Sequence, residues 1–292
     1  MQRLLYLLIY PLLWATSMLP MRLLYFKSDC LYILAYHVFR YRKKVVLSNL
    51  KLVFPEKTEE ERKAIAKAFY HHLCDIIFET IKSMTISEEE AKRRFDVQNI
   101  ELLRDYESRG RSVLMFCGHY ASWEWSSIIN RQTTLKGLGV YKKLDNPYFD
   151  RLVKKIRGKF GAEIISNKKI VTSLFRLNKK GIRSVTLVLA DQTPKVGAFK
   201  HRDTFMGIDV PVFTGTEELA KKLNFAVVYM KVEKVRRGYY KANFIPLAED
   251  PNSYPDFDIT RMFLNEIEKQ IHKEPQYYLW SHKRWKLRNT LQ

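Results

Sequence analysis

The sequence predicts an α/β fold with a central, mainly parallel sheet flanked by helices. Short runs of strand-forming apolar residues alternate with amphipathic helical segments, which is typical of parallel sheets. The run 184–190 has the character of a buried strand. The chain has 292 residues, 46% of them hydrophobic, enough for one large core or two modest ones. Because no repeat or low-complexity linker interrupts it, residues 46–292 are expected to form one domain.

Capping signals and apolar spacing place the individual elements. Thr58 with Glu61 forms a capping box that opens a helix to about Ser83, and Ser87 with Glu90 repeats the signal. Further helices are predicted at about 99–110, 146–159, 170–180, 214–223 and 259–272. Strands are predicted at 113–117, 139–142, 162–165, 184–190, 225–232 and 239–246, with a long basic, aromatic loop from 194 to 212.

The charge balance indicates an anionic partner. The chain has 51 Lys and Arg against 31 Asp and Glu, a net charge of +20. Such an excess favours binding to nucleic acid or to an anionic membrane surface. The three cysteines lie far apart, which excludes a disulfide framework and a cysteine zinc site and fits a reducing compartment. His71 and His72 are adjacent and point different ways on their helix, so they are not expected to share a metal.

Residues 1–45 are predicted to be a membrane anchor. Leu4 to Met21 holds no charged residue, and eighteen such residues reach the lower limit for a membrane-spanning helix. The basic residues follow this stretch rather than precede it, which favours a cytoplasmic remainder. The basic, aromatic sequence also suits a helix that lies in the interface of an anionic leaflet. A cleaved signal peptide and a buried core helix are the alternatives.

The segment from Ser112 to Trp125 carries the candidate chemistry. An apolar strand from Val113 to Cys117 precedes Gly118 and His119, and Ser122 is expected to open a helix with Glu124 in its first turn. A continuous helix would hold His119 and Glu124 about 140° apart. A turn at the strand end brings them together instead, and ligands bind at such strand ends.

We therefore predict that His119 is a general base oriented by Glu124, which activates a hydroxyl for attack on an acyl group. A hydrogen-bonded structural histidine is the alternative. Cys117, two residues earlier, is expected to be a buried and inert thiol rather than a nucleophile.

Over most of its length, this segment included, the chain resembles the late acyltransferases of lipid A biosynthesis, members of the lysophospholipid acyltransferase superfamily. The shared motifs occur in family order over about residues 40–286. They are Asn49-Leu50, Phe54-Pro55-Glu56, Gly118-His119, Trp123-Glu124, Tyr141, Asn146-Pro147, Arg157, Gly161, Asp191-Gln192, Phe205-Met206-Gly207, Thr214-Gly215, Leu219-Ala220, Glu274-Pro275-Gln276-Tyr277, Trp280, His282 and Arg284-Trp285-Lys286.

The resemblance implies a glycerolipid acyltransferase-like fold and an enzyme of the bacterial inner membrane with its catalytic domain facing the cytoplasm. The implied reaction transfers a fatty acyl chain from acyl-carrier protein to a hydroxyl of a lipid A precursor, without a metal or bound cofactor. By position, His119 takes the role of general base and Glu124 the role of orienting it. Arg157 and Asp191 match two further polar positions, and Ser122 stands where the family commonly has Asn.

Chemical reasoning gives the remaining polar residues candidate roles. Arg157 is expected to bind a lipid phosphate or the oxyanion, with a surface salt bridge as the alternative. Asp191 is expected to position Arg157 or a substrate hydroxyl, or to be a structural cap. Lys142 and Lys143 are candidates for phosphate binding. Backbone amides at the start of the Ser122 helix are candidate donors to the oxyanion.

Two partners follow from the charge, because acyl-carrier proteins are acidic and lipid A precursors carry phosphates. The basic tail from Trp280 contains a second tryptophan and suits a membrane interface. One alternative is the same chemistry on another acceptor, such as a lysophospholipid, an aminolipid or a glycolipid. A membrane-tethered nucleic-acid-binding protein is the other, although no nucleic-acid-binding motif is present and no nucleic-acid partner is expected.

Overall fold

A seven-stranded sheet forms the centre of the molecule in the computed structural model, which describes residues 1–197 and 199–290. The strand order is β1-β9-β8-β2-β5-β3-β4, and only β8 and β9 pair in antiparallel fashion. The strands are β1 (Phe95–Val97), β2 (Val113–Cys117), β3 (Lys136–Tyr141), β4 (Glu163–Ser166), β5 (Ser184–Leu189), β8 (Ala226–Arg236) and β9 (Tyr239–Ala248). The predicted α/β class with a mainly parallel sheet is therefore confirmed. The last two residues of the predicted domain 46–292 lie outside the described residues.

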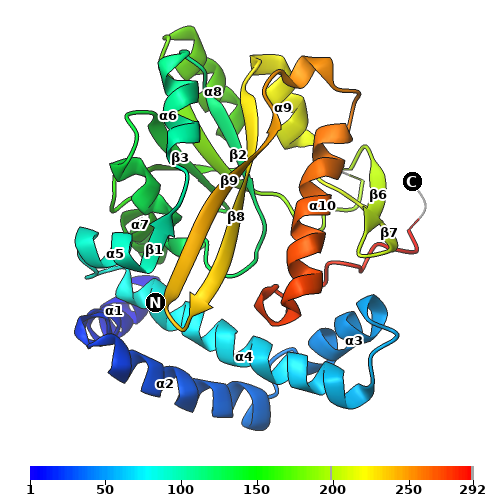
Figure 1. Cartoon of the computed structure of the whole chain (residues 1–292). Helices are drawn as coiled ribbons and strands as arrows, with labels where there is room; N and C mark the ends of the chain where they lie inside the picture. The colour runs from blue at the N-terminus through cyan, green and yellow to red at the C-terminus, as the bar shows by residue number, and fades with distance from the viewer. Residues whose placement is uncertain (198, 291–292) are drawn as a thin grey trace.

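Helices flank the sheet, with α10 along one side and α6 and α7 along the other (Figure 1). The helices that follow β1 in the chain are α6 (Glu101–Ser108), α7 (Pro147–Arg157), α8 (Ile170–Lys179), α9 (Gly215–Leu223) and α10 (Asp258–Lys273). Those that precede it are α1 (Gln2–Met18), α2 (Met21–Ile33), α3 (Lys43–Val53), α4 (Glu59–Lys82) and α5 (Glu88–Arg94), with a short π-helical turn, η1 (Leu34–Val38), after α2.

Local signals account for the helix starts. The capping box of α4 is complete: the Glu61 N–H donates to Thr58 Oγ1 (3.2 Å) and the Thr58 N–H donates to Glu61 Oε2 (2.7 Å). At α7 the Asn146 side chain accepts from the N–H groups of Tyr148 and Phe149, and a proline occupies the first turn. These helices begin where the sequence predicted them because their capping contacts are local.

The core sits between the sheet and its helices. Every residue of β2 is buried, and Phe116 stacks on Phe263 of α10 with ring centroids 4.9 Å apart. Trp280 and Trp285 stack on each other at 5.8 Å and are at most 1% exposed. The expectation that the basic tail lies at a membrane interface is therefore wrong for these two side chains, because they pack inside the core.

A short hairpin replaces part of the long loop predicted before residue 212. β6 (Arg202–Phe205) and β7 (Ile208–Pro211) pair in antiparallel fashion through a two-residue turn. Met206 and Gly207 form that turn, both with positive φ (54° and 75°), which matches the twist of paired strands. The usual Asn-Gly or Asp-Gly signal is missing there, so the sequence did not reveal the hairpin.

The N-terminal helices pack beside the sheet rather than into it. α4 crosses beneath the lower ends of β8 and β9, and α1 and α2 lie along its outer side (Figure 1). Leu24 is fully buried against this core, whereas most large apolar side chains of α1 are exposed, among them Leu4, Leu8 and Leu12 at 65–70%. In the described part of the chain no helix is both long and apolar enough to cross a membrane.

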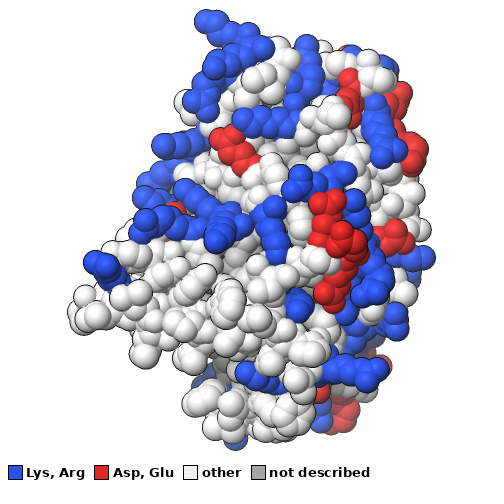
Figure 2. Space-filling view, turned by 90° about the vertical axis from the view of Figure 1, so that its left-hand side faces the viewer, with Lys and Arg blue, Asp and Glu red and all other residues white. Residues whose placement is uncertain are grey.

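Charge is unevenly spread over the side of the molecule that lies at the left in Figure 1. Figure 2 shows a broad area without charged side chains on its lower part, with Lys and Arg gathered above it. The large apolar side chains that are exposed in the first 41 positions are Met1, Leu4, Leu5, Leu7, Leu8, Leu12, Trp14, Met18, Leu23, Phe26, Ile33, Leu34, Val38, Phe39 and Tyr41. We call this set the N-terminal apolar face.

Candidate active site

The sheet brings together three segments that are far apart in the sequence. β2 pairs with β5 so that Cys117 lies opposite Leu189, and β3 pairs with the other edge of β5. His119, Asp191 and Lys142 follow these three strands at their carboxyl ends, where open α/β sheets bind ligands. In Figure 1, β8 points toward α4, and β2 and β5 run parallel to it, so this end of the sheet faces α4.

Asp191 holds the His119 side chain. The Nδ1 atom of His119 lies 2.6 Å from Asp191 Oδ1, and the His119 backbone N–H donates to Asp191 Oδ2 at 3.0 Å. Asp191 is 1% exposed, and burial alone would raise its pKa. The charge and the two hydrogen bonds of His119 outweigh burial and lower the pKa of Asp191 below its ordinary value. An ionised carboxylate only accepts, so Nδ1 carries the proton.

The other ring nitrogen of His119 faces a cleft. Because Nδ1 is protonated, neutral His119 has its lone pair on Nε2, where the Gln192 amide lies at 3.1 Å. The ring packs edge-on against Trp123 with centroids 5.1 Å apart. The side chain is 16% exposed and lines the cleft. A nitrogen with this lone pair and this access has the geometry of a general base.

The predicted contact between Glu124 and His119 is not the one that forms. Glu124 accepts two hydrogen bonds from Arg157, from Nε at 3.0 Å and Nη2 at 2.6 Å, and one from Trp123 Nε1 at 3.1 Å. The carboxylate on Nδ1 of His119 belongs to Asp191. The expectation that Asp191 positions Arg157 also fails, because Glu124 pairs with Arg157.

Long-range backbone contacts explain this exchange of partners. The predicted helix begins at Glu124, as the 3₁₀ helix η2 (Glu124–Arg131), and not at Ser122. Tyr120 instead forms a β-bridge with Tyr278, and the Ala121 N–H donates to the Tyr277 carbonyl at 3.0 Å. The turn after His119 is thus held open against the C-terminal segment, which directs Glu124 toward α7.

The cleft combines apolar walls with basic groups. Its volume is about 1220 Å³, and His119, Glu124 and Arg157 line it. Its apolar lining includes Ile129, Leu138, Ile164, Val171, Leu187 and Phe213. Lys142 and Lys143 are exposed and also line it. Such a space suits a ligand with a long apolar part and an anionic part.

Ser122, which was a candidate for substrate binding, and Cys117 lie near the site, but neither lines the cleft. Ser122 is fully buried, and within the described residues its hydroxyl has no hydrogen-bond partner. Cys117 is 1% exposed and burial raises the pKa of its thiol, as expected of an inert cysteine.

Among residues 1–197 and 199–290, no group of three or more His, Cys, Asp or Glu side chains is placed to hold a metal ion.

Sequence reasoning missed the roles of Gln192 and Trp123. Both lie beside residues that were singled out, and the signal for Gln192 was its place directly after a buried strand. His282 was quoted only as part of a motif, yet its Nε2 accepts from the Thr193 N–H at 3.3 Å. Burial lowers the pKa of His282 to about 4, so it stays neutral beside the site.

A buried carboxylate thus holds a histidine whose second ring nitrogen faces a cleft with apolar walls, which is an arrangement that suits an enzyme with a histidine general base. The chain belongs to the bacterial lipid A biosynthesis acyltransferase family, whose model matches residues 1–287. It is 26% identical over 281 residues to the lipid A biosynthesis lauroyltransferase of Escherichia coli (strain K12), which covers 94% of this chain and 89% of the relative. The palmitoleoyltransferase of the same strain is 23% identical over 278 residues, with the same two coverages. A third relative, the myristoyltransferase of that strain, is 20% identical over 238 residues, or 82% of this chain and 73% of the relative. The protein is therefore an acyltransferase.

Proposed function

We propose that this acyltransferase moves a fatty acyl chain from the thioester of acyl-carrier protein to a hydroxyl of a lipid A precursor. One observation carries the proposal: the Nε2 lone pair of His119, fixed by Asp191, faces an apolar-walled cleft in a chain of the lipid A acyltransferase family. The substrates named for the relatives support the acceptor.

His119 supplies the general base in this proposal. Nε2 takes the proton of the acceptor hydroxyl while its oxygen forms the new C–O bond to the thioester carbon. The C–S bond then breaks, and the imidazolium returns the proton to the departing thiolate, so the carrier leaves as a thiol. Asp191 stabilises the imidazolium in between. Such proton transfer is typically worth about 10²- to 10⁴-fold in rate.

Arg157 and Glu124 have a separate role. Arg157 binds a lipid phosphate or the thioester oxyanion, and its two hydrogen bonds to Glu124 fix the plane of the guanidinium. Lys142 and Lys143 attract the anionic part of either substrate.

The N-terminal apolar face binds the bacterial inner membrane from the cytoplasmic side. Its exposed Leu, Phe and Trp side chains suit the boundary between headgroups and acyl chains, and the Lys and Arg above them suit anionic headgroups (Figure 2). The mouth of the cleft would then meet a lipid acceptor at the surface where such lipids lie.

Mass spectrometry of lipid A tests the function. Cells without the gene should have lipid A that lacks one acyl chain, and the wild-type gene should restore it. A gene that carries His119→Ala should not, although the variant protein accumulates in the membrane fraction. Because the relatives are named for different acyl chains, the restored mass also identifies the chain. Unchanged lipid A in the mutant cells would overturn this acceptor and favour another lipid, which profiling of total lipids would reveal.

A further inference from the structure

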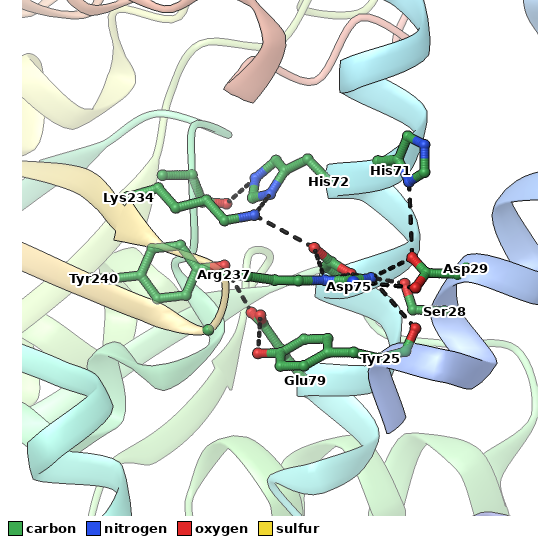
Figure 3. Close-up of polar contacts among 12 residues, drawn as sticks. Tyr25, Ser28, Asp29, His71, His72, Asp75, Glu79, Lys234, Arg237 and Tyr240 are labelled. Atoms are coloured by element: carbon green, nitrogen blue, oxygen red, sulfur yellow. Dashed lines mark hydrogen bonds and ion pairs between the residues drawn. The ribbon is translucent and has the colours of Figure 1, made fainter. Parts of the chain in front are cut away.

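A partly buried polar network joins the N-terminal helices to the catalytic domain (Figure 3), and none of its residues lines the cleft. It lies between α2, α4 and the turn that connects β8 to β9. Its members are Tyr25, Ser28 and Asp29 of α2, His72, Asp75 and Glu79 of α4, and Lys234, Arg237 and Tyr240 of the hairpin. We call this set the helix–hairpin network.

Arg237, in the turn between β8 and β9, contacts both α2 and α4. It donates to Asp75 through Nε and Nη2, the shortest contact being 2.6 Å, and to Asp29 at 2.6 and 3.2 Å. Asp75 also accepts from Ser28 Oγ at 2.8 Å. A guanidinium that bridges two carboxylates in this way fixes the three elements relative to one another.

Lys234 extends the network toward the active site. Its ammonium lies 3.4 Å from Asp75 Oδ2 and 3.2 Å from His72 Nδ1, and its side chain is only 9% exposed. Because an ammonium has no acceptor, Nδ1 of His72 must accept, and the ring proton lies on Nε2. That nitrogen lies 3.2 Å from the carbonyl oxygen of Ala121, which can only accept. The two partners therefore select one tautomer.

Ala121 belongs to the catalytic loop, two residues after His119. It is 1% exposed and its φ is +51°, a left-handed conformation that a residue with a Cβ adopts only when its surroundings enforce it. Its N–H donates to the Tyr277 carbonyl and its carbonyl accepts from His72. These two contacts hold the strained peptide from both sides.

We propose that His72 and Lys234 are positioning residues for the acyl transfer: they hold the Ala121 carbonyl so that the loop presents His119 Nε2 to the cleft. Arg237 and Asp29 tie this support to α2. The inference rests on the proposed function and deepens it, because it names residues outside the cleft that set the rate of the same reaction.

The chemistry of His72 fits support and excludes proton transfer. Unlike His119, it does not line the cleft and is only 5% exposed, and its two nitrogens face Ala121 and Lys234 inside the protein. Burial, reinforced by the charge of Lys234, lowers the pKa of His72 well below its ordinary value. The ring therefore stays neutral and keeps its Nε2 proton directed at the Ala121 carbonyl.

A pair of polar substitutions tests the support. Gln at position 72 places an amide nitrogen near the site of Nε2 and can still donate to Ala121, whereas the shorter Asn reaches only Lys234. In His72→Asn, kcat should fall by about 10- to 100-fold, because small displacements of reacting groups have effects of that size. The KM for the acyl donor should stay unchanged, and His72→Gln should restore kcat close to the wild-type value.

His71 provides the matched control. It is the preceding residue of α4, stacks on Tyr32 of α2 with centroids 3.5 Å apart and is half-exposed. Its Nδ1 lies 3.8 Å from Asp29 Oδ1, which is too far for a hydrogen bond. His71→Asn should leave kcat unchanged. Equal kcat for His72→Asn, His72→Gln and the wild type would overturn the proposal. So would equal losses in His72→Asn and His71→Asn, because they would show that any change in α4 suffices.

Nitrogen NMR tests the inference without an activity assay, so its failure can be distinguished from failure of the proposed function. The sample is the detergent-solubilised full-length protein with labelled histidine. The chain has seven histidines, and the signal of His72 is the one that disappears in His72→Gln. It should report a proton on Nε2 throughout pH 5.5–8, and a proton on Nδ1 would overturn the inference. If the wild type transfers no acyl chain, the proposed function fails. In that case the nitrogen signals of His119 decide. If they shift in His72→Asn but not in His71→Asn, His72 positions the loop that carries His119. If they do not shift in His72→Asn, the inference is overturned.

Discussion

His119 and His72 are two histidines of one chain with opposite arrangements. His119 has its proton on Nδ1, facing Asp191, and its Nε2 faces a cleft. His72 has its proton on Nε2, facing the Ala121 carbonyl, and its Nδ1 faces Lys234. An anionic partner stabilises the imidazolium of the first, and a cationic partner opposes it in the second. The same side chain thus serves as a candidate base in one place and as a fixed support in the other, and its charged neighbour decides which.

The largest effect is expected from breaking the His119 half of this comparison. Asp191→Asn replaces an acceptor with an amide that can donate to Nδ1, which favours a proton on Nε2 and removes the base. We expect kcat/KM to fall by about 10²- to 10⁴-fold. Steady-state assays with an acyl-carrier thioester measure this. A near-normal rate in Asp191→Asn, together with a severe loss in Glu124→Gln, would return the orienting role to Glu124.

The second effect concerns Glu79, which belongs to the helix–hairpin network and lies two turns after His72 on α4. Tyr25 (3.1 Å) and Tyr240 (2.8 Å) donate to this 1% exposed carboxyl, and burial raises its pKa to about 7. The folded protein therefore keeps a proton that the unfolded chain loses near its ordinary pKa of 4.5. Stability from this group is full below pH 4.5 and decreases as the pH rises to about 7, by up to about 3 kcal/mol.

Glu79→Gln should remove that pH dependence. Urea unfolding at several pH values between 4 and 8 measures the free energy of unfolding of the variant and of the wild type. The value for the variant minus the value for the wild type should increase as the pH rises to about 7 and stay constant above it. A constant difference across this range would mean that the pKa of Glu79 is not raised in the folded protein.

The smallest effect is expected at the ion pair between Arg157 and Glu124. The sequence spacing had predicted His119 as the partner of Glu124. Arg157→Lys keeps the charge and loses the two-point contact with Glu124, and kcat/KM should fall by about 10-fold. Glu124→Gln should have a similar effect, and the double variant should lose less than the sum, because the two side chains act together. Fully additive losses would show that Glu124 acts through another residue.

Much of the fold followed from local patterns. The helix caps at Thr58 and Ser87, the strand at 184–190 and the asparagine–proline start of α7 depend on neighbours in the chain, and these elements form where they were predicted, although only Thr58 has a complete capping box. The β6–β7 hairpin was missed because its Met-Gly turn is an unusual one. The predicted anchor over residues 1–45 stays a prediction, with the N-terminal apolar face as its support.

The sequence by itself determined which residues lie at the end of which strand, and so marked His119 and Asp191 as candidates. Only the tertiary structure decided that these two bind each other, because the β2–β5 register joins positions 72 residues apart. It likewise turned Glu124 toward Arg157, through backbone contacts between residues 120–121 and 277–278. Local sequence patterns determine whether a segment forms a strand or a helix and which residue caps the helix. The partner of a side chain depends on strand order and register, which are set by the packing of the whole core.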